Sequence, residues 1–303
     1  MPSVSGGQTV SVCLPALDEE ATIGAICSSI RTSLMPRVVD ELIVIDSGSS
    51  DATAVVAEES GARVHHVDDI APRLQAGGKG EALWKSLAVA RGDIVVWIDS
   101  DIRNFTPAFV TKLVGPLVRS PELVMTKAFY RRPLLLEDHE GSGGRVTELG
   151  VRPLLNLLYP ELAHIVQPLS GEYALRRDAA LDLNFFSGYG VDIGLLIDAV
   201  RRFGTSALRQ VDLGTRVHNH RSLHDLGRTS FEVQKALLTR MADVGRVALD
   251  REMADRLVQF DADHAPRVTY DEMVELPSRN AVAHALTIDT HLTRKGRDDV
   301  EAA

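Results

Sequence analysis

The first third of the chain alternates between short apolar runs and segments of helical character, and this alternation limits the possible folds more than any other feature. The apolar runs are typical of β-strands and occupy residues 10–17, 41–47, 63–69 and 93–101. The segments between them have helical spacing or are bounded by glycine and capping residues, at 18–34, 48–62 and 77–92. This order predicts an α/β fold with a mostly parallel sheet and helices on both faces.

Polar side chains follow the predicted strands at their carboxyl ends. In open parallel sheets, ligands bind in the crevice beyond these ends. Four segments qualify, at Pro15 to Glu19, Asp46 to Ser49, Gly77 to Gly80 and Asp99 to Asp101. We expect them to meet at one rim of the sheet and form a binding site there, although they lie far apart along the chain.

Two carboxylates, Asp99 and Asp101, follow the apolar run IVVWI, the clearest of these strand patterns. Placed together at the end of a buried strand, they repel each other and lose hydration unless a cation compensates them. Carboxylate oxygens suit Mg²⁺ or Mn²⁺, which also bind the phosphates of a nucleotide. The alternative is that both residues cap the following helical segment at 105–114.

Two further rim segments are compatible with a nucleotide ligand. Asp46 can accept hydrogen bonds from a base or ribose, although an Asx-type turn explains its position equally well. Glycines 77, 78 and 80 let the backbone approach phosphate, and Lys79 supplies a positive charge. The spacing is neither a Walker P-loop nor a dinucleotide fingerprint, and a flexible surface loop remains the alternative.

The second half is less regular. Strand patterns occur at 124–132 and 168–177, residues 208–221 are expected to form a strand that leads into a His-rich loop, and a helix bounded by glycines is expected at 188–204. From Ser230 to Phe260 the periodicity is helical throughout, which predicts a helical C-terminal region. Its apolar face either covers the protein's own sheet or joins two copies in a homodimer.

Basic side chains in this half gather in two places. In Arg216 to Arg221, the two terminal arginines could neutralise phosphate, and His218 could join Asp101 in binding a metal. Gly144, Arg145 and Thr147, at the start of a predicted helix, form a candidate anion site. A structural histidine and a plain loop are the competing interpretations.

Composition excludes several classes of protein. Lys and Arg total 33 against 42 Asp and Glu, a formal charge of −9, which disfavours general binding to nucleic acid or to anionic membranes. The N-terminal residues lack the pattern of a signal peptide, and no run reaches the roughly 18 apolar residues of a membrane span. Because Cys13 and Cys27 are interpreted as buried free thiols, we expect a cytoplasmic protein.

The combination of motifs resembles the GT-A nucleotide-sugar glycosyltransferases. The matching segments are LPALDEE, DSGSSD, GGKGEAL and DSD. The second half is similar to the glucosyl-3-phosphoglycerate synthases of actinobacteria, whose retaining family also contains mannosyl-3-phosphoglycerate synthases. The segments concerned are GSGGRVTELGVRPLLNLLYPEL, QPLSGEYALRR, GYGVDIGLLID and TRVHNHR, and the likeness spans roughly residues 8 to 290.

The resemblance implies a role for individual residues. Nucleotide-sugar binding falls to Pro15, Ala16, Leu17, Glu19, Asp46, Ser47, Lys79, Asp99, Ser100, Tyr189 and Asp192. Acceptor binding falls to Gly144, Arg145, Thr147, Asn219 and Arg221. Asp101 and His218 would hold the metal, and Asp99, Asp192 and Arg216 would form the catalytic group. The corresponding division is a nucleotide-sugar half at 1–132, an acceptor and metal half at 133–228, and a helical appendage at 229–303.

The implied reaction is transfer of glucose from UDP-glucose to the 2-hydroxyl of 3-phospho-D-glycerate, with retention of anomeric configuration and with Mg²⁺ or Mn²⁺. Glucosylglycerate and methylglucose lipopolysaccharide would lie downstream. GDP-mannose as donor and a polyprenyl phosphate acceptor are alternatives on the same fold. A non-catalytic nucleotide-sugar-binding protein is the alternative from another class, since fold alone does not determine function.

Overall fold

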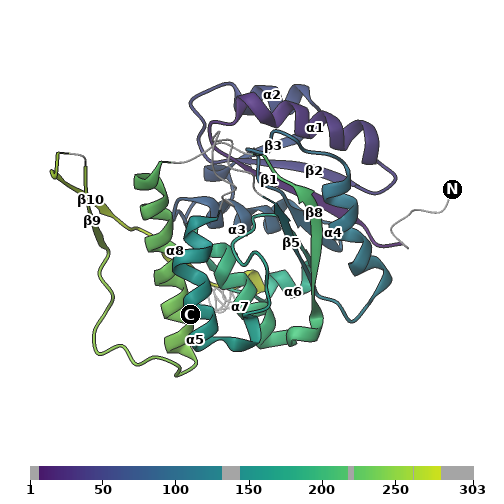
Figure 1. Ribbon diagram of the computed structural model, residues 1–303. Helices are drawn as coiled ribbons and strands as arrows, with labels where there is room; N and C mark the ends of the chain where they lie inside the picture. The colour runs from purple at the N-terminus through teal and green to yellow at the C-terminus, as the bar shows by residue number, and fades with distance from the viewer. Residues whose placement is uncertain (1–6, 132–143, 218–221, 262, 281–303) are drawn as a thin grey trace, which may run out of the picture.

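The computed structural model describes residues 7–131, 144–217, 222–261 and 263–280 (Figure 1). Its centre is a seven-stranded sheet in the order β3-β2-β1-β4-β6-β5-β8. The strands are β1 (Val10–Ala16), β2 (Glu41–Asp46), β3 (Arg63–His66), β4 (Ile94–Trp97), β5 (Met125–Arg131), β6 (Tyr173–Arg176) and β8 (Leu208–Thr215). Strand β6 runs antiparallel to both of its neighbours, and the other pairs are parallel. The predicted mostly parallel α/β sheet is confirmed.

Helices cover both faces of this sheet. They are α1 (Glu20–Leu34), α2 (Thr53–Glu59), α3 (Lys79–Val89), α4 (Ala108–Arg119), α5 (Arg152–Leu158), α6 (Arg177–Leu181), α7 (Val191–Phe203) and α8 (Leu223–Asp243). Shorter helical turns are η1 (Val67–Asp69), η2 (Thr147–Val151), η3 (Pro160–Leu162) and η4 (Thr205–Ala207). Helices α5, α7 and α8 pack against one another around a hydrophobic core of their own (Figure 1).

Successive side chains of each central strand point to opposite faces of the sheet, and both faces are buried. In β1, Val12 and Leu14 pack in a core with α1 and α4, whereas Cys13 packs in a second core with α3 and α7. A strand buried on both faces must be apolar along its whole length. This requirement explains the continuous apolar runs of β1, β2 and β4.

The predicted helical C-terminal region is confirmed in α8, but the helix is shorter than predicted. Helix α8 ends at Asp243, and Gly245 follows with a positive φ of 69°. The prediction of helix through to Phe260 is wrong, because β9 (Arg256–Phe260) is a strand paired with β10 (Pro266–Tyr270). The chain then returns to the core, where β11 (Glu275–Leu276) pairs with β7 (Phe185–Phe186). Solvent exposure alternates from residue to residue along Arg256–Phe260, which is the two-residue period of a half-exposed strand and not the period of a helix.

Both cysteines are buried free thiols, as predicted. Burial raises the pKa of Cys13 and of Cys27 to about 12. Within the part of the chain that the structure describes, no helix combines the length and the apolar character needed to cross a membrane. The cytoplasmic location stays a prediction.

Candidate functional site

A cavity of about 600 Å³ opens at the carboxyl ends of β1, β2 and β4. It is lined by Pro15, Ala16, Leu17, Glu19, Ser47, Gly78, Lys79, Asp99, Ser100, Asp101, Tyr189, Asp225, Arg228 and Thr229. All four rim segments singled out in the sequence contribute to this lining, so their predicted convergence is confirmed. The roles assigned to the individual residues stay predictions.

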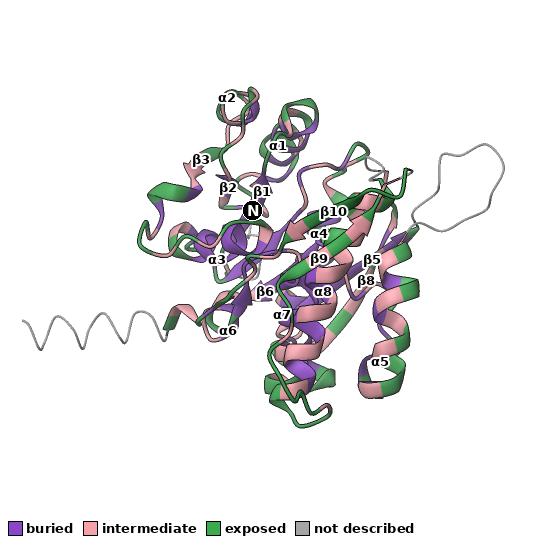
Figure 2. Ribbon diagram, turned by 90° about the vertical axis from the view of Figure 1, so that its left-hand side faces the viewer, coloured by how far each residue is buried: buried purple, intermediate pink, exposed green. Residues whose placement is uncertain are grey.

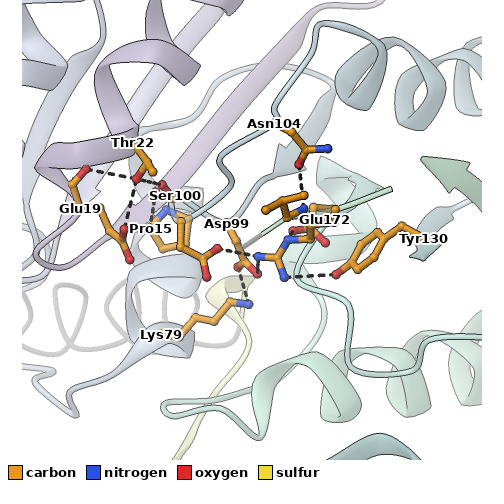
Figure 3. Close-up of polar contacts among 12 residues, drawn as sticks. Pro15, Glu19, Thr22, Lys79, Asp99, Ser100, Asn104, Tyr130 and Glu172 are labelled. Atoms are coloured by element: carbon orange, nitrogen blue, oxygen red, sulfur yellow. Dashed lines mark hydrogen bonds and ion pairs between the residues drawn. The ribbon is translucent and has the colours of Figure 1, made fainter. Parts of the chain in front are cut away.

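Asp99 lies at the centre of a compact cluster of charges (Figure 3). Its carboxylate pairs with Lys79 Nζ at 2.8 Å and with Arg216 Nη2 at 2.9 Å. The same Arg216 nitrogen donates to Asp101 Oδ1 at 2.6 Å. Two cations therefore already compensate the carboxylates that the sequence analysis expected to repel each other.

Lys79 is held between two carboxylates at the start of α3. Besides Asp99, its Nζ donates to Asp192 Oδ2 of α7 at 3.1 Å. Burial alone would lower the pKa of Lys79, but Asp192 and Asp99 outweigh it and raise that pKa above its ordinary value. The lysine is therefore a permanent positive charge facing the cavity.

Glycine is required where α3 begins. Gly78 has a φ of 84°, which favours glycine. A Cβ on Gly80 would lie 1.7 Å from the carbonyl oxygen of Phe186, so only glycine lets α3 approach β7. The glycine loop thus fixes the position of Lys79 in addition to leaving room for a ligand.

Arg216 follows β8 and is almost fully buried, with 3% of its surface exposed. Its Nε lies 3.0 Å from Glu172 Oε1, and its Nη1 contacts the Tyr130 hydroxyl at 3.4 Å. Burial opposes the charge, but Glu172 and the other facing groups raise the pKa of Arg216 well above its usual value. In this structure the guanidinium faces carboxylates, and its contact with a phosphate stays a prediction.

The loop after β1 is tied to the end of β4. Thr22 Oγ1 donates to the carbonyl oxygen of Ser100 at 2.6 Å, and Ser100 Oγ donates to that of Pro15 at 2.7 Å (Figure 3). These hydrogen bonds hold together two of the segments predicted to bind the nucleotide, the one after β1 and the one after β4. Asp46 is buried and accepts from the backbone N–H of Ser49 at 3.3 Å, an Asx-type contact, while its contact with a base or ribose stays a prediction. Its neighbour Ser47 lines the cavity instead.

The predicted acceptor residues are placed only in part. Gly144 precedes the helical stretch that begins at Arg145 and leads into η2, and Thr147 is buried in η2. None of these three lines the cavity, although η2 packs against α8, which does. His218, Asn219 and Arg221 lie outside the described residues.

Helix α8 provides a wall that sequence reasoning missed. Asp225, Arg228 and Thr229 line the cavity from its first two turns. Their spacing of three and four residues puts polar side chains on one helical face, and this was the available signal. No sequence motif near these residues connects this face of α8 to the distant strand ends, so the sequence alone does not place it in the site.

The donor set fits a hard divalent cation. Asp101 presents a partly exposed carboxylate to the cavity, and carboxylate oxygen is the ligand that Mg²⁺ and Mn²⁺ prefer. Among the described residues no group of three or more His, Cys, Asp or Glu side chains forms a closed metal site. Of the two predicted metal ligands, Asp101 lies in the described part of the chain and faces the cavity, whereas His218 lies outside it.

Comparison with known proteins shows extensive similarity. Residues 11–181 match the family model described as glycosyl transferase family 2. The chain is 51% identical over 246 residues to a Mycobacterium tuberculosis protein named glucosyl-3-phosphoglycerate synthase, covering 79% of this chain and 76% of the relative. A protein of the same name from Petrotoga mobilis is 46% identical over 264 residues, covering 86% and 81%.

Solved structures of the Mycobacterium tuberculosis synthase have the same fold. The complex with Mn²⁺, UDP-glucose and phosphoglyceric acid superposes with a TM-score of 0.82 at 45% identity and covers 92% of each chain. The complex with Mg²⁺ and UDP has the same TM-score and identity, covering 92% of this chain and 93% of the other.

Proposed function

This chain belongs to glycosyl transferase family 2 and, within it, to the glucosyl-3-phosphoglycerate synthases, and from this premise we infer that it transfers glucose from UDP-glucose to 3-phosphoglycerate. The observation that carries the inference is the cavity at the strand ends, where Lys79, Asp99 and Asp101 lie together. A fold neighbour at 45% identity was solved with UDP-glucose and phosphoglyceric acid. The chain is therefore an enzyme rather than a binding protein on the same scaffold.

The rim segments supply the donor site in this proposal. Pro15, Leu17 and Ser47 line the part of the cavity beyond β1 and β2, where the nucleotide would lie. Lys79 brings a permanent positive charge toward the diphosphate. Tyr189, which also lines the cavity, and Asp192, which pairs with Lys79, would face the transferred sugar.

Mg²⁺ or Mn²⁺ is the cofactor, as in the solved structures of the relatives. Asp101 would hold the ion, with His218 as the second ligand. When bound, a divalent ion neutralises charge on the leaving diphosphate.

We propose that the transfer retains the anomeric configuration and takes place at the 2-hydroxyl. A bond forms between that oxygen and the anomeric carbon, and the bond from that carbon to UDP breaks. The hydroxyl proton passes to the leaving diphosphate oxygen. Lys79 and Arg216 stabilise negative charge on the departing side, and Arg145, Asn219 and Arg221 would bind the acceptor's phosphate and carboxylate.

A product assay tests this function. Purified protein with Mg²⁺ receives UDP-glucose or GDP-mannose, each with and without 3-phosphoglycerate, and the product is followed by NMR. We expect acceptor-dependent transfer from UDP-glucose, with an α-anomeric coupling in the product. Transfer from GDP-mannose alone would overturn the donor, and a β-anomeric product would overturn retention.

Replacing Arg145 by alanine is expected to raise the KM for 3-phosphoglycerate by about 10- to 100-fold, because a charge-assisted hydrogen bond to phosphate is lost. The KM for UDP-glucose should change little. Initial-rate kinetics with each substrate varied in turn measure both values. Arg201→Ala removes an exposed α7 arginine that pairs with Asp198 and serves as the control. An unchanged acceptor KM in Arg145→Ala would show that the acceptor site lies elsewhere.

We also propose that the protein is a homodimer joined through the hairpin of β9 and β10. Its outer face carries Val258, Phe260, Val268 and Tyr270, exposed by 41%, 65%, 48% and 61% (Figure 2). The other face packs on α8, where Gln259 donates to the carbonyl oxygen of His224 at 3.2 Å. A two-stranded ribbon with one apolar face open to water is marginally stable alone, and a second copy would cover that face.

Sedimentation velocity checks the homodimer. We expect the wild-type protein to sediment as a dimer at micromolar concentration and Phe260→Asp to sediment as a monomer, because a carboxylate in an apolar interface loses its hydration. Val55→Asp changes an exposed apolar residue on α2 and should leave the dimer intact. A wild-type monomer, or a dimeric Phe260→Asp, would refute this interface.

A further inference from the structure

Two charged residues lie fully buried beneath the cavity without lining it. Lys127 of β5 and Glu172, which directly precedes β6, each have 0% of their surface exposed. Burial lowers the pKa of Lys127 to about 8, so its charge is held at a cost. Replacing buried charged side chains by apolar ones of similar volume often leaves a protein equally stable. The stability of the fold alone therefore does not explain why charged residues occupy these two positions.

Both residues fix the short segment 170–172, which belongs to one of the motifs singled out in the sequence. Lys127 Nζ donates to the carbonyl oxygen of Ser170 at 2.7 Å and lies 4.4 Å from the centre of the Tyr173 ring. The Glu172 carboxylate forms an ion pair with Arg216 Nε at 3.0 Å, and the Glu172 carbonyl oxygen accepts a hydrogen bond from the backbone N–H of Ala128. Buried charges therefore hold the segment at both ends.

Between these ends, Gly171 lies directly against Asp99. A Cβ at this position would be 2.3 Å from both oxygens of the Asp99 carboxylate, so no other residue fits without displacing it. The backbone of the segment is thus the surface on which Asp99 rests. Since Arg216 bridges Asp99 and Glu172, the same segment also sets where the guanidinium lies (Figure 3).

We propose that Lys127 and Glu172 are positioning residues for the transfer reaction, which fix segment 170–172 and through it the orientations of Asp99 and Arg216. Neither lines the cavity, so both act through other residues. The proposal rests on the proposed function, because it assigns these residues to the same reaction. A small displacement of a reacting constellation lowers the rate far more than it weakens substrate binding.

Glu172→Gln is the decisive variant, because it keeps the shape of the side chain and removes its charge. We expect kcat to fall by about 10- to 100-fold while the KM for UDP-glucose stays within about threefold of wild type. Lys127→Met should show the same split. Steady-state kinetics with both substrates, together with Tm, give the three values for each variant.

Asp198→Asn is the matched control. Asp198 of α7 pairs with the buried Arg240 at 2.8 Å, outside the donor cavity, so the variant breaks a comparable carboxylate–arginine pair. We expect it to lower Tm as Glu172→Gln does but to leave kcat near the wild-type value. A Glu172→Gln enzyme with wild-type kcat, or an Asp198→Asn enzyme with an equal loss of kcat, would overturn the proposal.

Gly171→Ala provides an independent test should Glu172→Gln fail to fold. Its methyl group must displace the Asp99 carboxylate, so a folded variant is expected to lose kcat, and a folded variant with full kcat would refute the positioning role. Transfer by the wild-type enzyme is measured in the same assay. Its absence would contradict the proposed function, whereas wild-type activity with unaffected variants would contradict only this inference.

Discussion

Replacing Asp101 by alanine is expected to lower metal-dependent turnover by about 10³-fold, since a bound divalent ion contributes several kcal/mol of charge stabilisation at the leaving group. The fold should survive the change. Arg216, which loses its 2.6 Å contact with Asp101, keeps its ion pairs with Asp99 and Glu172 and is not left as an unpaired buried charge. The loss is therefore catalytic rather than structural.

Binding of Mn²⁺ in the presence of UDP, followed by titration calorimetry, reports the same residue without requiring turnover. We expect Asp101→Ala to weaken this binding strongly while Tm changes little. Asp93→Ala is the control, because Asp93 precedes β4 at its other end and bonds to Thr9 rather than lining the cavity. Full activity of Asp101→Ala would remove Asp101 from the metal site.

The sheet and its rim could be predicted from the sequence because both depend on local pattern. A strand buried on two faces must be continuously apolar, which identified β1, β2 and β4. Parallel strands put their carboxyl ends on one side, and this rule alone predicts that Pro15, Lys79 and Asp99 lie close together.

The partners within the site had no local signal. Lys79 and Asp192 are 113 residues apart in sequence, and Arg216 and Asp99 are 117 apart. Such pairs exist only because the topology places α3, α7 and β8 around the same strand ends. The need for glycine at position 171 is similar, since it depends on the Asp99 carboxylate, which follows β4 and is distant in sequence, and not on a turn.

The error in the C-terminal region has a physical cause. Apolar residues in Arg256–Phe260 match a helical stripe over so short a window, and a hairpin that packs by one face supplies few further cues. Its strand character follows from pairing with β10, which lies beyond Phe260 and joins it in register.

The charges of the site lead to the second large effect. Lys79 pairs with both Asp99 and Asp192, and Asp99 also pairs with Arg216. Lys79→Met keeps most of the side-chain volume but leaves two poorly exposed carboxylates facing each other. Removing one partner of a buried ion pair costs on the order of 3 kcal/mol, so we expect Tm to fall by about 5–10 °C.

Activity in Lys79→Met should fall by more than stability does, by about 10²- to 10³-fold in kcat/KM, because the lysine also stabilises charge on the leaving diphosphate. Lys235→Met separates the two effects. Lys235 pairs with Asp271 at 2.8 Å with similar burial but does not line the cavity, so this variant should lose stability and keep its kcat/KM. If Lys79→Met were as active as Lys235→Met, the lysine would serve only to hold Asp99 and Asp192 together. Loss of UDP binding in a folded Lys79→Met, measured by calorimetry, would instead establish its contact with the nucleotide.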